Sequence, residues 1–209
     1  MTGSGNDGLS PGEGRETAES NASGGFRTAD DLLALAAGRP DMMACLQAVA
    51  ALDLPDCWIG AGFARAPVWD VLHGYRTPTP LGDIDVVFFD PDSDRECEAE
   101  AEAALSGALP GLLWSVHNQA RMHHHNGDAP YRDTGDALAH WLETPTAVAL
   151  RLGTDGRPEL LAPFGLDDLY GLQLRPTPHA RAHRLKAYRE RLDRKGWAKI
   201  WPKLTVDRG

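Results

Sequence analysis

The sequence predicts a protein of the α+β (α/β) class. Two helical segments open the part of the chain that contains apolar residues, three strand candidates then alternate with helices, and mixed elements follow. The 209 residues suit one domain, and 42% hydrophobic with 24% charged residues is usual for a globular protein. A chain of this length buries a core without help from disulfide bonds.

The first 27 residues are predicted to form a disordered arm. Residues 1–25 are mainly Gly, Ser, Asn, Glu and Thr, and so few apolar side chains cannot offset the entropy that is lost on ordering. The remaining residues, 28–209, are expected to form a single domain. The N-terminal residues also lack the basic and apolar segments of a secretory signal.

Cysteine usage and hydropathy predict a reduced, cytoplasmic protein with no membrane contact. Cys45, Cys57 and Cys97 form no C-x-x-C pair, which predicts neither a disulfide scaffold nor a cysteine-based zinc site. No apolar run approaches the roughly 18 residues that a membrane-spanning helix needs.

Helix signals begin at Thr28, which resembles an N-cap because Asp31 occupies the third helical position. The helix that follows is expected to stop at Gly38. Pro40 then opens a second helix, and Pro55 ends it.

The centre of the chain predicts three strands joined by helices. Residues 57–59 and 113–116 are short strand candidates, and residues 84–89 form a strong one because they are rich in Val and Phe. Helices are expected over 63–72 and 96–109. Residues 74–82 contain two prolines and two glycines and are therefore predicted to be a loop.

The last third of the chain mixes short elements. Its predicted elements are a polar loop that includes His123, His124 and His125, a short helix over 135–143, a hairpin of 146–152 with 158–161 around Asp155-Gly156, a helix over 165–170 and a basic helix over 179–197. The three histidines are not interpreted as a zinc site, since no cysteine or further histidine motif supports one.

Asp83 and Asp85 are the sharpest chemical feature of the sequence. They stand two residues apart at the start of a predicted strand, so their side chains share a face. Paired carboxylates suit Mg²⁺, which often shares its coordination shell with substrate phosphates. For two aspartates alone, a strand that begins in solvent is the more common explanation.

A glycine-containing turn precedes this strand. Gly60, Ala61 and Gly62 follow the first strand candidate and precede a helix, whose N-terminus offers free N–H groups to a phosphate. Such a turn is a weak signal alone, but its combination with the two aspartates favours a site for a nucleotide.

Several blocks of residues now carry a resemblance. They are IGAGFAR at 59–65, VWDVLHGY at 68–75, DIDV at 83–86, WSVHNQARMH at 114–123, PY at 130–131, ETPTAV at 143–148, APFGLDDL at 162–169, KGW at 195–197 and WPKL at 201–204. Taken together, over residues 42–206, the chain resembles a bacterial nucleotidyltransferase-like family of the DNA polymerase β superfamily. The resemblance implies a small mixed β-sheet flanked by helices.

The resemblance also implies roles for individual residues. Asp83 and Asp85 would be catalytic and would bind the metal, Mg²⁺ with Mn²⁺ as an alternative. The triphosphate would lie beside Gly60, Ala61 and Gly62, with further nucleotide or phosphate contacts from Arg65, Asn118, Gln119 and Arg121. For the last three residues the alternative is structural: the amides would satisfy loop backbone groups and Arg121 would pair with an acid.

The chain departs from the superfamily pattern at one important position. Many members place a third carboxylate on a neighbouring strand, and the matching strand here offers Ser115. Three explanations stay open: Asp90, Asp128 or Glu143 completes the site, one metal binds weakly, or catalysis has been lost. The distance from the glycines to Asp83 also requires an inserted loop at residues 74–81.

Charge is spread unevenly along the chain. Residues 175–209 hold 11 lysines and arginines against 3 acidic residues, while the other residues hold 10 against 27, for a net charge of −9. A basic segment on an acidic body predicts either a polyanionic partner or a helix whose cations face that body.

The function expected from these features is Mg²⁺-dependent transfer of a nucleotidyl group from a nucleoside triphosphate to an acceptor hydroxyl. The acceptor is a nucleic acid or a small molecule that the sequence does not identify. A non-catalytic nucleotide- or RNA-binding member of the same fold is the alternative, and an interaction protein with two ordinary surface aspartates is the third hypothesis.

Overall fold

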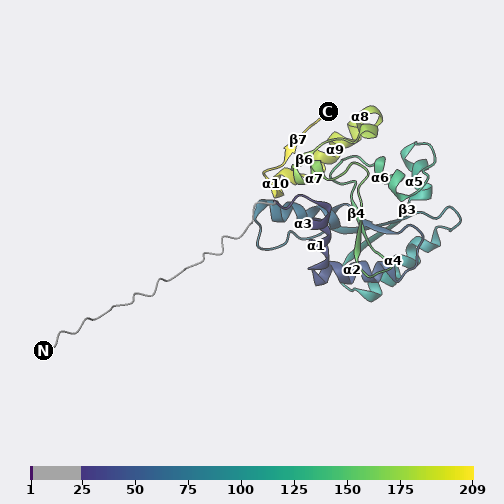
Figure 1. Cartoon of the computed structure of the whole chain (residues 1–209). Helices are drawn as coiled ribbons and strands as arrows, with labels where there is room; N and C mark the ends of the chain where they lie inside the picture. The colour runs from purple at the N-terminus through teal and green to yellow at the C-terminus, as the bar shows by residue number, and fades with distance from the viewer. Residues whose placement is uncertain (2–24) are drawn as a thin grey trace.

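The structure is a computed structural model that describes Met1 and residues 25–209. A five-stranded sheet with the order β3-β2-β1-β4-β5 forms its centre (Figure 1). The strands are β1 (Trp58–Gly60), β2 (Asp83–Phe88), β3 (Leu113–Asn118), β4 (Ala149–Leu152) and β5 (Pro158–Leu161), and a separate pair comprises β6 (Gln173–Leu174) and β7 (Thr205–Val206). The predicted mixed sheet flanked by helices is confirmed.

In the part of the chain that the structure describes, six helices precede β4. They are α1 (Ala29–Ala37), α2 (Pro40–Ala50), α3 (Gly62–His73), α4 (Glu96–Ala108), α5 (Gln119–Asn126) and α6 (Thr134–Ala139). Four short or medium helices follow: α7 (Asp167–Tyr170), α8 (Pro178–His183), α9 (Leu185–Lys195) and α10 (Trp197–Ile200). The predicted disordered arm, residues 1–27, lies outside the described residues except for Met1 and 25–27.

The capping signals at the start of the domain act as predicted. The Thr28 side chain accepts a hydrogen bond from the backbone N–H of Asp31, and the Asp31 carboxylate accepts one from the backbone N–H of Thr28 in return. Pro40 occupies the first turn of α2, where its missing N–H costs no hydrogen bond.

The register of the sheet separates a core face from an open face. In β2, Ile84, Val86 and Phe88 are buried and belong to the main core, whereas Asp83 and Asp85 project from the opposite face. Strand β3 runs parallel to β2 and pairs Asp85 with Ser115, while β1 and β4 are antiparallel neighbours. The two aspartates therefore lie at the start of β2 on the face opposite the main core, called the open face here, whereas Val87 further along the same face is buried in a smaller cluster with Trp58 and Leu138.

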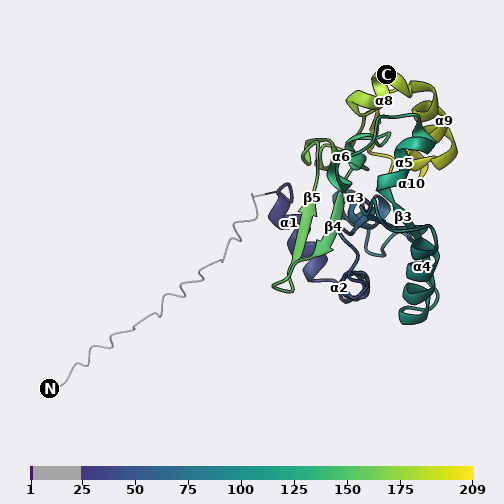
Figure 2. The same cartoon turned by 90° about the vertical axis from the view of Figure 1, so that its right-hand side faces the viewer.

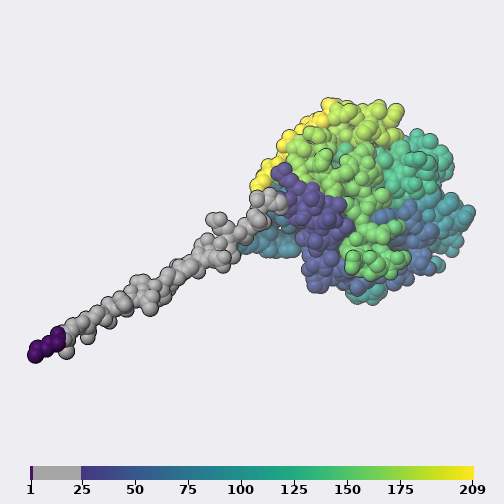
Figure 3. All heavy atoms as spheres, viewed as in Figure 1, coloured from purple at the N-terminus to yellow at the C-terminus, as the bar shows by residue number. Residues whose placement is uncertain are grey.

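Helices cover the core face and one end of the sheet. Helices α1 and α2 pack on β5 and β4, and α4 packs on β3. In both cartoon views α2 and α4 lie at one end of the molecule and α8 and α9 at the opposite end (Figure 2). The space-filling view shows the C-terminal residues, in yellow, lying along the surface at that end (Figure 3).

Two predicted elements differ from the structure. The residues His123, His124 and His125 lie on helix α5, not in a loop, because the Asn118 side chain caps this helix by accepting from the N–H of Ala120. The predicted basic helix over 179–197 is two helices, α8 and α9, which meet at Arg184. No helix within residues 25–209 combines the length and apolar character required to cross a membrane.

The C-terminal helices are joined to the body by His179. Its Nε2 atom lies 2.9 Å from the Asp128 carboxylate, and its ring lies beside those of His140 and His183. Burial is the main cause that lowers the pKa of His179 below 6.5; Asp128 opposes this shift, and the charges of His140, His183 and Arg184 add to it.

A lowered histidine pKa makes stability depend on pH in a defined direction. Protonation favours the unfolded chain, so the contribution of His179 is present above pH 6.5 and is lost as pH falls through its lower folded-state pKa. We expect the free energy of unfolding, measured with urea, to fall over this window. The variant His179→Gln should show a shallower fall, and an equally steep one would contradict this assignment.

Candidate functional site

Strand β2 positions the two aspartates side by side on the open face. Asp83 is exposed and Asp85 is partly buried. Burial, and next the negative charge of Asp83, raises the pKa of Asp85, while the cations Arg191 and Lys195 act in the opposite direction. Two carboxylates that repel each other in this way favour a cation between them.

The turn between β1 and α3 places main-chain N–H groups beside these aspartates. Gly60 is required for packing, since a Cβ atom there would lie 2.8 Å from the ring atom Cη2 of Trp141. At Gly62 the nearest atom to an added Cβ is 3.8 Å away, on Arg65, so the backbone stays open. No side chain caps the first turn of α3, which leaves its N–H groups available to an anion.

Ala61 adopts a backbone conformation that alanine seldom takes, with φ 53° and ψ −121°. Such strain costs about 1–3 kcal/mol, and glycine removes it at an entropic cost of about 0.4–1 kcal/mol. We expect Ala61→Gly to raise the free energy of unfolding by about 1 kcal/mol in urea titrations. The control Ala104→Gly, on the exposed side of α4, should instead lower it by about 1 kcal/mol.

Arg65 is buried in the first turns of α3 and faces the same site. Its Nη1 atom donates to the Thr146 hydroxyl at 2.7 Å, and its guanidinium lies 4.6 Å from the ring centre of Trp197. Burial lowers the pKa of Arg65 to about 10, so the group stays charged at neutral pH. Its buried Nε atom has no hydrogen-bond partner among the described residues.

A second arginine, which is partly buried, comes from the C-terminal helix α9. Arg191 Nε lies 3.0 Å from Oε1 of Glu143, a carboxylate that is 1% exposed. Burial is the main cause that raises the pKa of Glu143, and the charges of Arg191 and Arg65 oppose this shift. Arg65, Arg191 and Glu143 thus carry two positive charges and one negative charge.

Arg65 and Arg191 line a cavity of about 180 Å³ together with the two aspartates. The turn contributes Ala61 and Gly62, and the loop Thr79–Gly82 forms another wall. Its charged walls are Arg65, Asp83, Asp85, Arg191 and Lys195. We call it the phosphate cavity, because cations and open N–H groups face two carboxylates across it.

The wall formed by residues 79–82 is fixed by a buried carboxylate on α3. Asp70 accepts hydrogen bonds from the backbone N–H and the hydroxyl of Thr79, at 2.7 and 2.6 Å. It also accepts one from the indole N–H of Trp201 at 2.8 Å. Asp70 therefore connects the inserted loop with the C-terminal segment.

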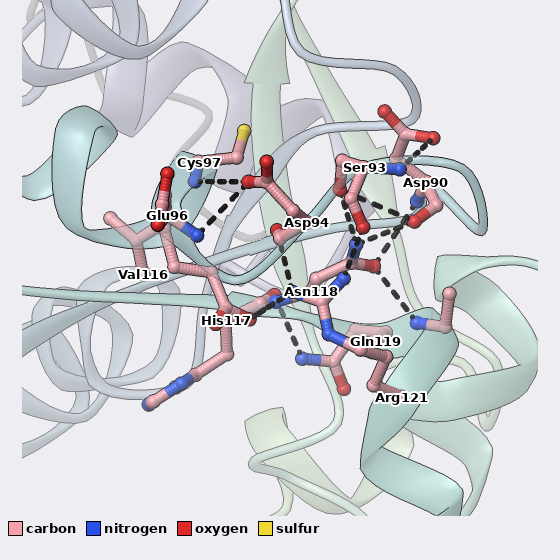
Figure 4. Close-up of polar contacts among 12 residues, drawn as sticks. Asp90, Ser93, Asp94, Glu96, Cys97, Val116, His117, Asn118, Gln119 and Arg121 are labelled. Carbon is pink, nitrogen blue, oxygen red and sulfur yellow. Dashed lines mark hydrogen bonds and ion pairs between the residues drawn. The ribbon is translucent and has the colours of Figure 1, made fainter.

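The three predicted site residues on β3 and α5 do not lie at one place in the structure. Gln119 lines a second cavity, of about 210 Å³, whose walls also include Asp85. The Asn118 amide instead donates to the Asp90 carbonyl and to Ser93 at 2.9 Å (Figure 4). Arg121 donates to the carbonyls of Ser93 and Asp94 at 2.7 and 3.1 Å, and lies 3.3 Å from Glu98. Asn118 and Arg121 thus secure the loop before α4 and do not line either cavity.

Of the three acids that were considered as replacements at the Ser115 position, one reaches the site. Glu143 lines the cavity that also contains Asp85. Asp90 accepts hydrogen bonds from its own loop, and Asp128 pairs with His179. Ser115 itself lies 3.0 Å, through its hydroxyl, from Nε2 of His117.

The donor set fits a divalent cation that takes part of its shell from a ligand. Within residues 25–209 no three His, Cys, Asp or Glu side chains converge to hold a metal ion. The protein contributes two carboxylates, and Mg²⁺ is commonly held by one or two carboxylates together with waters and phosphate oxygens.

Arg191 and Lys195 are site residues that sequence reasoning missed. The available signals were the basic composition of residues 175–209 and, for Lys195, the family-like block KGW at 195–197, and neither says which cations turn inward. Four arginines of this segment pair with carboxylates: Arg175 with Asp168, Arg181 with Asp207, Arg191 with Glu143 and Arg208 with Asp193. Part of the positive charge is therefore neutralised within the protein.

Several solved structures share this fold. One is described by the words "the NMR structure of the protein reveals a CCA-adding enzyme head domain"; it is 36% identical, with a TM-score of 0.77, over 85% of this chain and 95% of that chain. A CCA-adding enzyme with CTP is 14% identical with a TM-score of 0.52, and an apo CCA-adding enzyme is 18% identical with 0.50. The chain spans 43% and 45% of the length of these last two enzymes.

A family model supplies the assignment. No match was found among curated proteins. The model described as "Nucleotidyltransferase" matches residues 47–206, which include the glycine turn, both aspartates and the α9 cations. The chain therefore belongs to this nucleotidyltransferase family.

Proposed function

We propose that this protein transfers a nucleotidyl group from a nucleoside triphosphate to an acceptor hydroxyl, with Mg²⁺ or Mn²⁺ held by Asp83 and Asp85. The observation that carries the proposal is the phosphate cavity, in which these carboxylates face open helix N–H groups and buried cations. Family membership and the fold shared with CCA-adding enzymes support nucleotidyl transfer in general.

The triphosphate is assigned to the cations and the turn. The N-terminal N–H groups of α3, beginning at Gly62, favour phosphate oxygens. Arg65 and Arg191 together exceed the charge of Glu143 by one, and Lys195 adds a further cation to the same cavity. Asp83 and Asp85 balance these cations in the free protein, so a divalent cation on the two aspartates would leave an excess of positive charge for a polyanion to offset.

The site would promote the reaction by positioning the acceptor and the triphosphate and by neutralising charge on the phosphates. The acceptor oxygen forms a bond to the α-phosphorus while the bond from that phosphorus to the bridging oxygen breaks; the hydroxyl proton passes to water, and pyrophosphate leaves. The divalent cation, when bound, neutralises charge on the phosphates. Arg65 and Lys195 are placed to hold the leaving pyrophosphate, and Glu143 orients Arg191 beside Asp85.

The acceptor class is a nucleic acid or a small molecule. The solved CCA-adding enzyme with CTP supports a nucleoside triphosphate as donor. The basic C-terminal segment supports a polyanionic acceptor, although four of its arginines are paired within the protein. A steep fall of RNA affinity with salt would favour nucleic acid, and a flat response would argue against it.

A transfer assay tests the proposal. The protein is incubated with each α-³²P-labelled nucleoside triphosphate, Mg²⁺ and a cell extract, and both the labelled acceptor and the released pyrophosphate are measured. We expect label transfer by the wild type and by Asp92→Asn, an exposed control, and none by Asp83→Asn. Nucleotide binding without pyrophosphate release would instead favour the non-catalytic alternative, which Ser115 at the register position of Asp85 supports.

A further inference from the structure

The second cavity, of about 210 Å³, adjoins the phosphate cavity on the open face of the sheet. The two cavities share Ala61, Asp85 and Arg191. Beyond Asp85, the second cavity extends past His117 to Met122 of helix α5. Asp85 therefore stands where the two cavities meet.

The geometry of nucleotidyl transfer indicates what the second cavity holds. The attacking oxygen, the α-phosphorus and the leaving oxygen lie in line during such a displacement. The leaving pyrophosphate is assigned to Arg65 and Lys195, which line the phosphate cavity and not the second one. The acceptor hydroxyl must then approach from the other side of Asp85, where the second cavity lies.

Polar and charged side chains form most of the wall of this cavity. Toward α5 they include Gln119, Asn126 and Arg184. The amide nitrogens of Gln119 and Asn126 donate to the His117 carbonyl and the Tyr131 hydroxyl, at 3.2 and 3.0 Å. Each amide oxygen is left to accept a hydrogen bond from a ligand hydroxyl. These walls suit a hydrophilic molecule.

Arg184 is a partly buried cation in this wall, at the junction of α8 and α9. Its charge opposes the burial that raises the pKa of Tyr131 to about 12 and adds to the burial that lowers the pKa of His179, so it lies near both side chains. Asp128, the acid of this neighbourhood, already accepts from the Tyr131 hydroxyl at 2.5 Å and lies 2.9 Å from His179. Within residues 25–209 no carboxylate pairs with Arg184.

The size and the surroundings of the second cavity favour a small molecule over a nucleic acid. Sites that enclose a drug-sized ligand commonly measure about 300–1,000 Å³, and this cavity is smaller. A nucleic acid also requires unpaired cations along its path outside the cavity. Arg175, Arg181 and Arg208 of the basic segment instead pair with acids of the protein.

We propose that the acceptor is a small hydroxyl compound with an anionic group, a phosphate or a carboxylate, and that Arg184 binds this group in the second cavity. The inference rests on the proposed nucleotidyl transfer. The planar guanidinium offers paired N–H donors that match either kind of anion. At the Asp85 end, the acceptor oxygen bonds to the α-phosphorus, the bond to pyrophosphate breaks, and the hydroxyl proton passes to water.

A transfer assay with a fractionated cell extract tests the class of acceptor. Ultrafiltration separates the macromolecules from a filtrate of small molecules, and each fraction is incubated with the protein, Mg²⁺ and α-³²P-labelled nucleoside triphosphates. We expect label in the filtrate, on a product that anion-exchange chromatography shows to carry more negative charge than its phosphodiester alone. Phosphatase lowers that charge if the anionic group is a phosphate monoester and leaves it unchanged if the group is a carboxylate.

Variants of Arg184 test its contact with the acceptor. In dilute filtrate, where the rate reports kcat/KM for the acceptor, Arg184→Gln should slow transfer by about 10- to 100-fold, the effect of losing a charge-assisted hydrogen bond. Arg184→Lys keeps the charge and should retain part of the rate. The matched control Arg194→Gln, exposed in the last turn of α9 and outside both cavities, should transfer like the wild type. Isothermal titration should show unchanged affinity of each variant for Mg²⁺-tripolyphosphate and for Mg²⁺-nucleoside triphosphates, which also shows that the variants are folded.

The outcomes distinguish this inference from the function on which it rests. A wild type that fails to bind Mg²⁺-tripolyphosphate, or that labels neither fraction, would contradict the proposed function. Label on the macromolecules, or on a neutral or cationic small molecule, would overturn this inference alone. An Arg184→Gln variant with wild-type kcat/KM would also overturn it. So would a variant that loses affinity for the nucleoside triphosphates, because the second cavity would then bind the nucleotide.

Discussion

Replacing Glu143 by glutamine is expected to lower the free energy of unfolding by about 3–5 kcal/mol, because it leaves buried Arg65 and partly buried Arg191 without their counter-charge, and this loss exceeds the burial cost that raises the pKa of Glu143. Glu143 is 1% exposed and lies 3.0 Å from Arg191, and Arg65 is 5% exposed. Glutamine keeps the size of the side chain, so the change isolates the charge. Urea unfolding at 25 °C measures the effect.

A surface ion pair of the same chain provides the matched control. Arg151 and Glu159 lie 2.6 Å apart, with side chains 41% and 45% exposed. Exposed pairs contribute about 0–1 kcal/mol, so Glu159→Gln should lower stability by no more than that. If the Glu143 and Glu159 variants lose equal stability, burial of Glu143 does not increase the contribution of its charge to the free energy of unfolding.

Asp85→Asn should abolish transfer and at the same time stabilise the protein in the absence of metal. Burial and the charge of Asp83 raise the pKa of Asp85, which means that the ionised carboxylate is unfavourable in the free protein. A neutral asparagine removes that cost, and we expect a gain of about 1 kcal/mol, as is typical when a strained functional group is replaced. Transfer should fall by about 10³-fold or more, as observed when a charge-stabilising group is removed from other enzymes.

Both effects are measured on one preparation. Urea unfolding in EDTA gives the stability, and pyrophosphate release with Mg²⁺ and a nucleoside triphosphate gives the activity. Asp92→Asn, in an exposed turn, should change neither quantity. A loss of stability in the Asp85 variant would mean that this carboxylate supports the fold, contrary to a role in metal binding.

Local signals predicted most of the fold. The Thr28 cap, Pro40 at a helix start and the hairpin at Gly156, with φ 77°, all depend on neighbours in the chain. The separation of α8 from α9 at Arg184 was missed because no proline or glycine marks it. Helix α5 was missed because three consecutive histidines have low helix propensity, and the cap from Asn118 outweighs it.

The candidate site was predictable only where it is local in sequence. Asp83 and Asp85 share a strand, so their common face follows from alternation alone. Arg191 and Glu143 are 48 positions apart, and only the tertiary fold brings them together. Asn118 and Arg121 were expected near the nucleotide, and hydrogen bonds to the loop at Ser93 occupy them instead.

We propose that Asp83 and Asp85 bind a divalent cation together with a triphosphate. Isothermal titration of a nucleoside triphosphate into the protein, with Mg²⁺ or with EDTA, measures this coupling. We expect tight binding by the wild type only with Mg²⁺, and loss of that dependence in Asp83→Asn. Equal affinity with Mg²⁺ and EDTA, or an Asp83 variant that binds like the wild type, would contradict it.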